Sequence, residues 1–390
     1  MKIAIVIQRY GTEITGGSEH LCRLTAERLA RKGHEIDVLT SCAKDYFSWK
    51  NEYTQGRSVI NGVTVYRFPT TRTRDLESFN KFSEQIYYNY HTTEDEMKWL
   101  EDQGPMCPGL VDFLKSMHRS YDRILFYTYL YYPTVLGMQI APEKSVLVPT
   151  AHDEPAIKLT IFREVFARPY ALIYNTEAEK DFVASLFTPR QIQQVGGIGV
   201  DVPRHVDKHA FRRQQGLMDD YFYYGGRIDA GKGCQEMIDF HLRKKQQNPD
   251  LPKLLLSGHL NMELPRDPSV VYLGYLSEED KQAAMAGASC TIIPSLMESL
   301  SIVLLESLAV RTPVLVKEGS AVLKSHCVKS NAGLYYNDSD DFSACLDYLM
   351  DHPRTCHQMG INGQRYVHNN YSWPRVVSLY EQVLSQNSGY

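Results

Sequence analysis

Two positively charged side chains stand in one glycine-rich loop that follows an apolar run. Arg227 and Lys232 lie within residues 225–233, together with glycines at positions 225, 226, 231 and 233. A guanidinium can bind two phosphate oxygens at once, an ammonium adds a point charge, and glycine lets the backbone approach a ligand closely. This combination favours a diphosphate ligand. An ordinary turn with solvated cations is the alternative when the loop is considered alone.

Two glutamates form a second candidate pair after another apolar run. Glu298 and Glu306 are eight positions apart and follow residues 290–294. We expect Glu298 in the loop after this run and Glu306 two turns into the following helix, and at about 3.6 residues per turn an eight-residue step places their carboxylates within roughly 80° of each other. One could bind a hydroxylated group and the other a second polyol, while the backbone at 300–303 would donate hydrogen bonds to a phosphate. For the spacing alone, two surface glutamates on an amphipathic helix are the simpler explanation.

One histidine stands where a third apolar run ends. His152 follows residues 146–149 and precedes Asp153 and Glu154. In that position its imidazole could bind a ligand hydroxyl or change charge near neutral pH, although a lone histidine is more often structural. A metal site made of these three residues ranks low, because the sequence shows no second cluster of ligands to complete the coordination. We therefore predict no metal and no resident cofactor.

An aromatic stretch follows a further predicted strand. Residues 126–133 contain Tyr129 and Tyr131 among several aromatic side chains. Tyrosine rings can stack on sugars, so these two are candidates for contact with an acceptor molecule. Core packing is the expected role for at least half of the aromatic residues in this stretch.

These loops need a scaffold that brings them together, and the order of apolar runs predicts one. Short runs typical of strands buried in parallel sheets alternate with helical stripes, for example at 19–32, 233–245, 278–288 and 301–309. The predicted strands are residues 2–7, 36–40, 62–68, 123–127, 145–149, 171–174, 193–197, 221–226, 253–258, 270–273, 290–294 and 313–316. Residues 41–115 are less regular and predict loops and helices added to the first half. The fold class is α/β, with two Rossmann-like, doubly wound domains that face each other across a cleft.

Composition narrows the classes of function. The chain has 390 residues and a net charge of −4, so no pervasive positive field exists to bind a nucleic-acid backbone. The eight cysteines are scattered without a CxxC pair, which is typical of reduced thiols in a cytoplasmic protein. The N-terminal run is too short for a signal peptide, and no apolar stretch approaches the ~18 residues of a membrane span. We expect a cytoplasmic protein, with peripheral contact at the inner face of the membrane left open.

Taken together, four loops, at residues 15–18, 151–154, 225–233 and 295–301, resemble those of the retaining GT-B glycosyltransferases of family 4, which use nucleotide-sugar donors. The resemblance extends along nearly the whole chain, and it depends on the order and spacing of motifs that are weak individually. These motifs are Gly16-Gly17, Arg31-Lys32-Gly33-His34-Glu35-Ile36, His152-Asp153, residues 195–201, Gly226-Arg227-Ile228-Asp229, Lys232-Gly233, Gly274-Tyr275-Leu276, and Glu298 with Glu306 as the family's EX7E motif.

The resemblance implies three segments and a role for each motif. Residues 1–200 would bind the acceptor, residues 201–370 the donor, and residues 371–390 would form a helix that crosses back to the first domain. The implied catalytic residues are His152, Glu298, Arg227 and Lys232. The implied donor-binding residues are Gly16, Gly17, Gly226, Tyr275, Leu276, Ser299, Leu300, Ser301, Ile302 and Glu306. Asp153 joins Tyr129 and Tyr131 as a candidate for acceptor contact.

The resemblance also implies a mechanism. Arg227 and Lys232 would neutralise the diphosphate, and the departing phosphate would help to deprotonate the acceptor hydroxyl, without a protein nucleophile or a metal. Ser301 departs from the family pattern, which commonly has glycine there, and its side chain would narrow the sugar or phosphate site.

The resemblance implies a hexosyltransferase that uses a UDP-sugar, for example UDP-glucose, with GDP next. This preference is a base rate, since no residue identifies the nucleotide. The predicted partners are that donor and a saccharide or lipid-linked acceptor, as in polysaccharide biosynthesis, with no nucleic acid. Two alternatives stay open: a scaffold subunit that binds a nucleotide sugar without transferring it, and an epimerase of related fold, which would form product without an acceptor.

Overall fold

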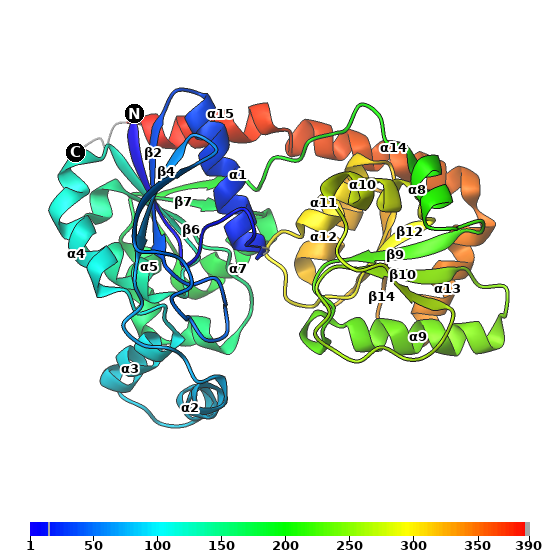
Figure 1. Ribbon diagram of the computed structural model, residues 1–390, viewed down its shortest axis with the longest axis horizontal. Coiled ribbons are helices and arrows are strands. Elements are labelled where there is room, and N and C mark those ends of the chain that lie inside the picture. Colours follow the sequence, from blue (N-terminus) through cyan, green and yellow to red (C-terminus); the bar gives the residue numbers. More distant parts are fainter. Residues whose placement is uncertain (15, 387–390) are drawn as a thin grey trace. The chain divides into compact units, whose positions relative to one another are not determined.

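The structure, a computed structural model, describes residues 1–14 and 16–386. The chain folds into two compact units, shown in Figure 1. Unit 1 comprises Met1–Ile198 together with the segment from Val376 onward, and unit 2 comprises Gly199–Arg375. Each unit is an α/β domain built on one sheet, so the predicted fold class of two Rossmann-like domains is confirmed.

The sheet of unit 1 has eight strands in the order β3-β4-β2-β1-β5-β6-β7-β8. Every neighbouring pair is parallel except β3 with β4. The apolar runs form strands because both sheet faces are covered, so every residue of β6 and β7 is buried. The strands are β1 (Lys2–Val6), β2 (Glu35–Ser41), β3 (Gly56–Ile60), β4 (Val63–Phe68), β5 (Arg123–Tyr127), β6 (Ser145–Val148), β7 (Ala171–Tyr174) and β8 (Ile192–Val195).

Helices connect these strands and supply the core of unit 1. A cluster of buried side chains joins β5 to the helices α3, α4 and α5, with Trp99 and Phe126 among its largest members. The helices are α1 (Gly17–Arg31), α2 (Leu76–Tyr88), α3 (Thr93–Gln103), α4 (Pro108–Met117), α5 (Tyr132–Gly137), α6 (Arg163–Ala167) and α7 (Glu177–Phe187), and the short 3-10 helix η3 covers Pro155–Lys158. The less regular region 41–115 thus contains three helices, where helices and loops were predicted, and the β3–β4 hairpin. Of the two hairpin strands, β4 was predicted and β3 was not.

The sheet of unit 2 has six parallel strands in the order β11-β10-β9-β12-β13-β14. Alternate residues of β9 pack on opposite faces: Phe222 and Tyr224 join the core under α9 and α13, whereas Tyr221 and Tyr223 join the core with α8 and α10. The strands are β9 (Tyr221–Gly225), β10 (Lys253–Ser257), β11 (Val270–Tyr272), β12 (Cys290–Ile293), β13 (Val314–Lys317) and β14 (Gly333–Tyr336).

The helices of unit 2 lie on both sides of its sheet (Figure 1). They are α8 (Lys208–Gln214), α9 (Cys234–Gln247), α10 (Glu278–Gly287), α11 (Ile302–Ala309), α12 (Ala321–Ser330), α13 (Ser339–Asp351) and α14 (Pro353–Asn370). The 3-10 helix η5 covers Ala230–Lys232. The last helix, α15 (Trp373–Ser385), begins in unit 2 and continues into unit 1, where the hydroxyl groups of Tyr380 and Tyr127 are 3.5 Å apart.

The strand order of each sheet determines which loops meet. In unit 2 the order reverses between β9 and β12, so the loops after these two strands leave the same edge side by side. In unit 1 the reversal lies between β1 and β5, with β6 next to β5. Every loop that the sequence selected for chemistry therefore follows a strand at its carboxyl end. Within residues 1–14 and 16–386, no helix is both long and apolar enough to cross a membrane.

Candidate active site

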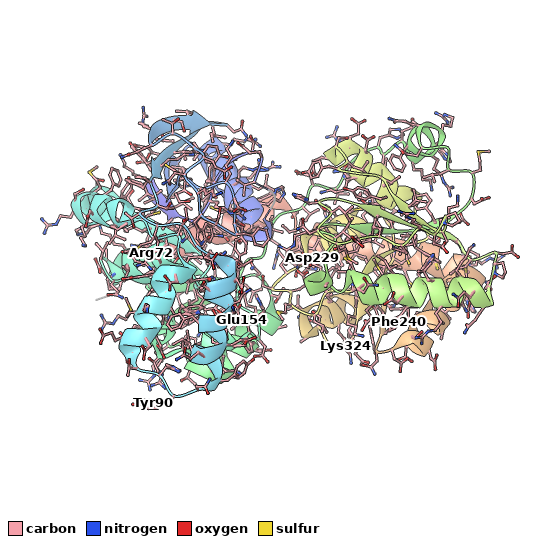
Figure 2. All side chains as sticks on the ribbon, turned by 60° about the horizontal axis from the view of Figure 1, so that its bottom comes forward. Arg72, Tyr90, Glu154, Asp229, Phe240 and Lys324 are labelled. Carbon is pink, nitrogen blue, oxygen red and sulfur yellow. The ribbon has the colours of Figure 1, made fainter. Side chains whose placement is uncertain are left out.

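Asp229 organises the cationic loop after β9. Its Oδ1 accepts a hydrogen bond from the backbone N–H of Lys232 at 2.8 Å, and its Oδ2 forms an ion pair with Nε of Arg227. The Arg227 side chain is 46% exposed, so its remaining N–H groups stay open to a ligand. Figure 2 labels Asp229 in this loop. The site prediction omitted Asp229, although an aspartate immediately before a helical turn is a recognisable capping signal.

Lys232 joins this loop to the loop after β12. Its Nζ lies 2.8 Å from Oε1 of Glu298, and both side chains are mostly buried. The close approach is possible because Gly233 has φ +75° and a Cβ there would lie 2.5 Å from the carbonyl oxygen of Pro294. Two residues 66 positions apart are thus brought into contact at the carboxyl edge of the sheet.

Glu306 lies in a different environment, on α11. Its Oε1 accepts a hydrogen bond from Nζ of Lys281 at 3.0 Å, and Lys281 also pairs with Glu278 at 2.8 Å. Burial raises the pKa of the Glu306 carboxyl, against the opposing effect of Lys281. Burial alone would lower the pKa of Lys281, but Glu306 and Glu278 together raise it above its ordinary value. Lys281 keeps its charge and offsets that of the buried glutamate.

The second carboxylate oxygen of Glu306 has no protein partner. Its Oε2 is buried and accepts no hydrogen bond from any of the residues that the structure describes. A buried acceptor without a donor is costly, so a ligand hydroxyl at this point would be stabilised. Lys281 was missed in the sequence, where it is one of several charged residues on an amphipathic helix.

The structure places Glu298 in the loop after β12 and Glu306 on the following helix, as predicted, but helical periodicity does not relate the two side chains. α11 begins only at Ile302, and Ser301 before it has the left-handed values φ +68° and ψ +86°. Helical periodicity therefore does not reach Glu298, which belongs to the loop 294–301. Leu300 is buried in this loop, and Ile302 is the first residue of the helix.

The residues predicted near the nucleotide lie after the carboxyl ends of strands in the sheet of unit 2. Tyr275 follows β11 through a turn at Gly274, and its side chain is 71% exposed. Leu276 instead packs against the core cluster around Tyr221 and Tyr223. Gly226, at the start of the cationic loop, has φ +146°. Ser299 lies next to Glu298 and has partners of its own.

In unit 1, the loop after β1 carries Gly16 and Gly17 into α1. A Cβ at Gly16 would lie 2.1 Å from Oε2 of Glu19, so this carboxylate closes the space beside the loop. Glu19 is buried and forms an ion pair with Arg9, whose Nη2 lies 2.6 Å from Oε1. The space beside Gly17 is open. Arg9 and Glu19 were not predicted as site residues.

The loop after β6 carries His152. Its Nε2 lies 3.8 Å from Oε1 of Glu154, and the same oxygen accepts a hydrogen bond from the Tyr129 hydroxyl at 2.6 Å. The Asp153 side chain is exposed, and its Oδ1 lies 3.9 Å from Nζ of Lys158. The carboxylate next to His152 is therefore Glu154, which Figure 2 labels. Among the residues described, no group of three His, Cys, Asp or Glu side chains could hold a metal ion.

The two tyrosines predicted to contact an acceptor are buried. Tyr129 is 1% exposed and packs against Phe162, and Tyr131 is 5% exposed and packs against Trp49. The expectation that they stack on sugar rings is corrected, because stacking needs an open ring face and both faces lie in core clusters. The apolar sequence around a tyrosine does not tell whether its ring packs in a core or faces a ligand. Asp153, the third candidate for acceptor contact, is exposed.

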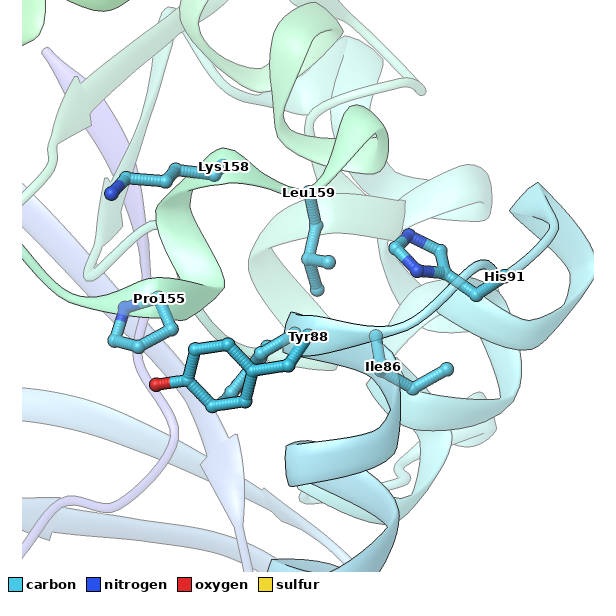
Figure 3. Close-up of a pocket in the computed structure, with 7 residues that line it drawn as sticks. Ile86, Tyr88, His91, Pro155, Lys158 and Leu159 are labelled. Carbon is cyan, nitrogen blue, oxygen red and sulfur yellow. The ribbon is translucent and has the colours of Figure 1, made fainter.

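A cavity of about 270 Å³ lies beside the 3-10 helix that continues the His152 loop (Figure 3). It is lined by Ile86, Tyr87, Tyr88, His91, Pro155, Lys158 and Leu159. Tyr88, at the end of α2, is 73% exposed, and its ring lies next to Pro155 in Figure 3. Pro155 follows His152 by three residues, so this exposed aromatic ring adjoins the predicted reaction loop.

Known proteins share this architecture. Residues 207–366 match the family model described as glycosyl transferases group 1. An uncharacterised glycosyltransferase of Methanocaldococcus jannaschii is 25% identical over 97% of this chain and 96% of its own length. The MMP alpha-(1->4)-mannosyltransferase of Mycolicibacterium hassiacum is 30% identical over 47% of this chain and 48% of its own.

Solved structures agree on the fold. Sucrose-phosphate synthase from Thermosynechococcus elongatus has a TM-score of 0.72 at 17% identity, covering 98% of this chain and 99% of its own. Anabaena HepE in complex with UDP has a TM-score of 0.72 at 15% identity, covering 99% and 100%. Two Rossmann-like units with ligand loops at their carboxyl edges thus define a protein of the GT-B fold. Over residues 207–366 the chain matches the group 1 glycosyltransferases, and over nearly its whole length it is similar to a glycosyltransferase.

The left-handed conformation of Ser301 has a consequence for stability. Ser301→Val should lower the free energy of unfolding of unit 2 by about 1–3 kcal/mol, because a β-branched residue strongly disfavours positive φ. Ser301→Gly should stay within about 1 kcal/mol of the wild type, since glycine relieves strain but adds entropy to the unfolded chain. Urea denaturation followed by circular dichroism measures both. The strain would be disproved if Ser301→Val cost no more than the control Ser325→Val on α12.

Proposed function

We propose that this chain is a retaining, metal-independent hexosyltransferase of glycosyltransferase family 4. It moves a hexosyl residue from a nucleotide-diphosphate sugar, with a UDP-sugar such as UDP-glucose favoured, to a saccharide or lipid-linked acceptor. The observation that carries this proposal is the contact between Lys232 and Glu298 at the point where the strand order of unit 2 reverses.

The donor binds through charge and hydroxyl recognition in unit 2. Arg227 and Lys232 supply two cations for the diphosphate, so no metal is needed to neutralise the leaving group. Glu298 holds the Lys232 ammonium and accepts hydrogen bonds from donor-sugar hydroxyls. The unpartnered Oε2 of Glu306 is suited to accept a ribose hydroxyl. The complexes of Anabaena HepE with UDP and with UDP-glucose support the choice of UDP.

The transfer retains the anomeric configuration. The bond between the anomeric carbon and the phosphate oxygen breaks, and the acceptor oxygen forms the new glycosidic bond on the same face. The acceptor proton passes to the departing phosphate, whose charge Arg227 and Lys232 stabilise. His152, next to Glu154, binds a hydroxyl of the transferred sugar. No residue needs to form a covalent intermediate.

The acceptor side of the proposal takes support from the cavity beside Tyr88. A saccharide presents C–H faces that stack on an exposed aromatic ring, and Lys158, His91 and the exposed Asp153 supply polar contacts nearby. We expect a cytoplasmic enzyme, which reaches a lipid-linked acceptor at the inner face of the membrane.

Nucleotide binding tests the donor site. A thermal-shift panel of UDP, GDP, ADP and CMP, repeated with their sugars and without added metal, should show selective stabilisation by UDP compounds, because a ligand of the folded state raises its stability. Lys232→Met should weaken UDP binding about 10–100-fold, the loss expected for a charge-assisted hydrogen bond. Removing this partly exposed ion pair should cost the fold only about 1 kcal/mol or less.

The control for this experiment is Lys253→Met, at the amino end of β10 and therefore at the opposite edge of the sheet. It should bind UDP like the wild type. In a transfer assay, Lys232→Ala and Glu298→Ala should lose transfer while remaining folded. Wild-type turnover in either variant would refute the site, and no shift with any nucleotide would contradict the proposed donor site, whereas nucleotide binding without transfer would favour the scaffold alternative.

The acceptor cavity generates a separate prediction. Tyr88→Ala should weaken binding of the recognised sugar about 2–10-fold in a ligand-observed NMR screen of free mono- and disaccharides, because it removes one stacking surface. Tyr88→Phe should keep binding. Tyr90→Ala is the matched control, since Tyr90 is exposed but does not line the cavity. Equal binding to Tyr88→Ala and the wild type would remove the cavity from the acceptor site.

A further inference from the structure

One buried histidine holds the backbone of the donor loop. Nε2 of His326, on α12, lies 3.0 Å from the carbonyl oxygen of Leu300, and both residues are buried. Leu300 lies two positions after Glu298 and immediately before Ser301, whose backbone is left-handed. A strained residue persists only where its surroundings restrain it, and this hydrogen bond restrains the peptide unit that joins Leu300 to Ser301.

The two hydrogen bonds of the imidazole determine its tautomer. A carbonyl oxygen can only accept, so Nε2 must carry the proton that it donates to Leu300. Burial lowers the pKa of His326 to about 4, so the ring is neutral near pH 7 and its Nδ1 is an acceptor. The Tyr366 hydroxyl, 2.9 Å away, must donate to that Nδ1. Its oxygen is then available to accept from Tyr371, whose hydroxyl lies 3.4 Å from it.

The same three rings form a packed cluster. The ring centroid of His326 lies 5.9 Å from that of Tyr366 and 5.7 Å from that of Tyr371, and both pairs meet edge to face. The backbone oxygen of Tyr371 accepts a hydrogen bond from Val200 at 2.7 Å, close to where the chain enters unit 2. The histidine is therefore held in place from the side opposite to the donor loop.

We propose that His326 is a positioning residue of the donor site. Its Nε2–H group holds the Leu300 carbonyl and thereby fixes the backbone that presents Glu298 to the donor, while the Tyr366 hydroxyl donates to Nδ1 and holds the ring in the orientation that makes this possible. Its effect on transfer rests on the proposed function. Its effect on the loop does not, because the hydrogen bond exists within unit 2 without any ligand.

Three variants separate positioning from packing. His326→Phe keeps a ring but removes both nitrogens, so the Leu300 carbonyl loses its donor. His326→Gln keeps a side-chain N–H that can reach this carbonyl, and it is the conservative rescue. Tyr366→Phe keeps the ring cluster and removes only the hydroxyl that donates to Nδ1. This last variant stays informative if His326→Phe fails to fold.

The ligand-free protein gives the first readouts. Nitrogen-15 NMR of labelled histidine should show His326 as the Nε2–H tautomer in the wild type and in Tyr366→Phe, with the Nδ1 signal shifted in Tyr366→Phe because this nitrogen loses its donor. Hydrogen exchange of a peptide covering 296–303 should be about 10-fold faster in His326→Phe and near wild type in His326→Gln. An Nδ1–H tautomer, or equal exchange in His326→Phe and the wild type, would overturn the proposal.

Kinetics give the second readout, with UDP as the binding probe. His326→Phe should lower kcat/KM for the donor about 10–100-fold, and His326→Gln should recover to within about 3-fold of the wild type. Failure of His326→Gln to recover any activity or loop protection would indicate a packing role and would refute positioning. If the wild type neither bound UDP nor transferred a sugar, the proposed function would fail, while the NMR and exchange results would still decide this inference.

Discussion

The ion pair between Lys232 and Glu298 is the interaction on which the site depends. Two opposite charges, partly removed from water, are held at 2.8 Å by loops that follow neighbouring parallel strands. A parallel sheet brings these loops to one edge, and the reversal of strand order between β9 and β12 leaves space between them for a ligand. Without an anion, Glu298 satisfies the lysine. With a diphosphate bound, the lysine can share its protons between the two.

Restraint of the backbone around this pair has several sources. Asp229 caps the cationic loop and orients Arg227, and the absence of a side chain at Gly233 lets this loop approach Pro294. On the other loop, strain at Ser301 is opposed by the hydrogen bond from His326 to Leu300. The positions of the charges are therefore fixed before a ligand arrives, which is the condition for electrostatic stabilisation of a leaving group.

More of the fold than of the site geometry could be predicted from the sequence. Apolar runs gave the bounds of β5 and β7 to the residue, because strands buried on both faces leave a continuous signal. The exposed strand β3 was missed, although Asn61-Gly62 is a strong hairpin signal. In the site, helical arithmetic failed for Glu298 because the helix begins only after Ser301. Lys281 and His326 could not be predicted as site residues because their partners, Glu306 and Leu300, are distant in the sequence. Tyr129 is buried and Tyr88 is exposed, and the local sequence does not encode this difference.

A crystal structure of the chain with a bound UDP-sugar tests the central claim most directly. We predict that the diphosphate lies within hydrogen-bond distance of Lys232 Nζ and the Arg227 guanidinium, with Glu298 on the donor sugar and Glu306 Oε2 on the ribose. A diphosphate bound elsewhere in the chain, or a nucleotide sugar in unit 2 that leaves the ion pair of Lys232 and Glu298 untouched and Arg227 free, would contradict the account.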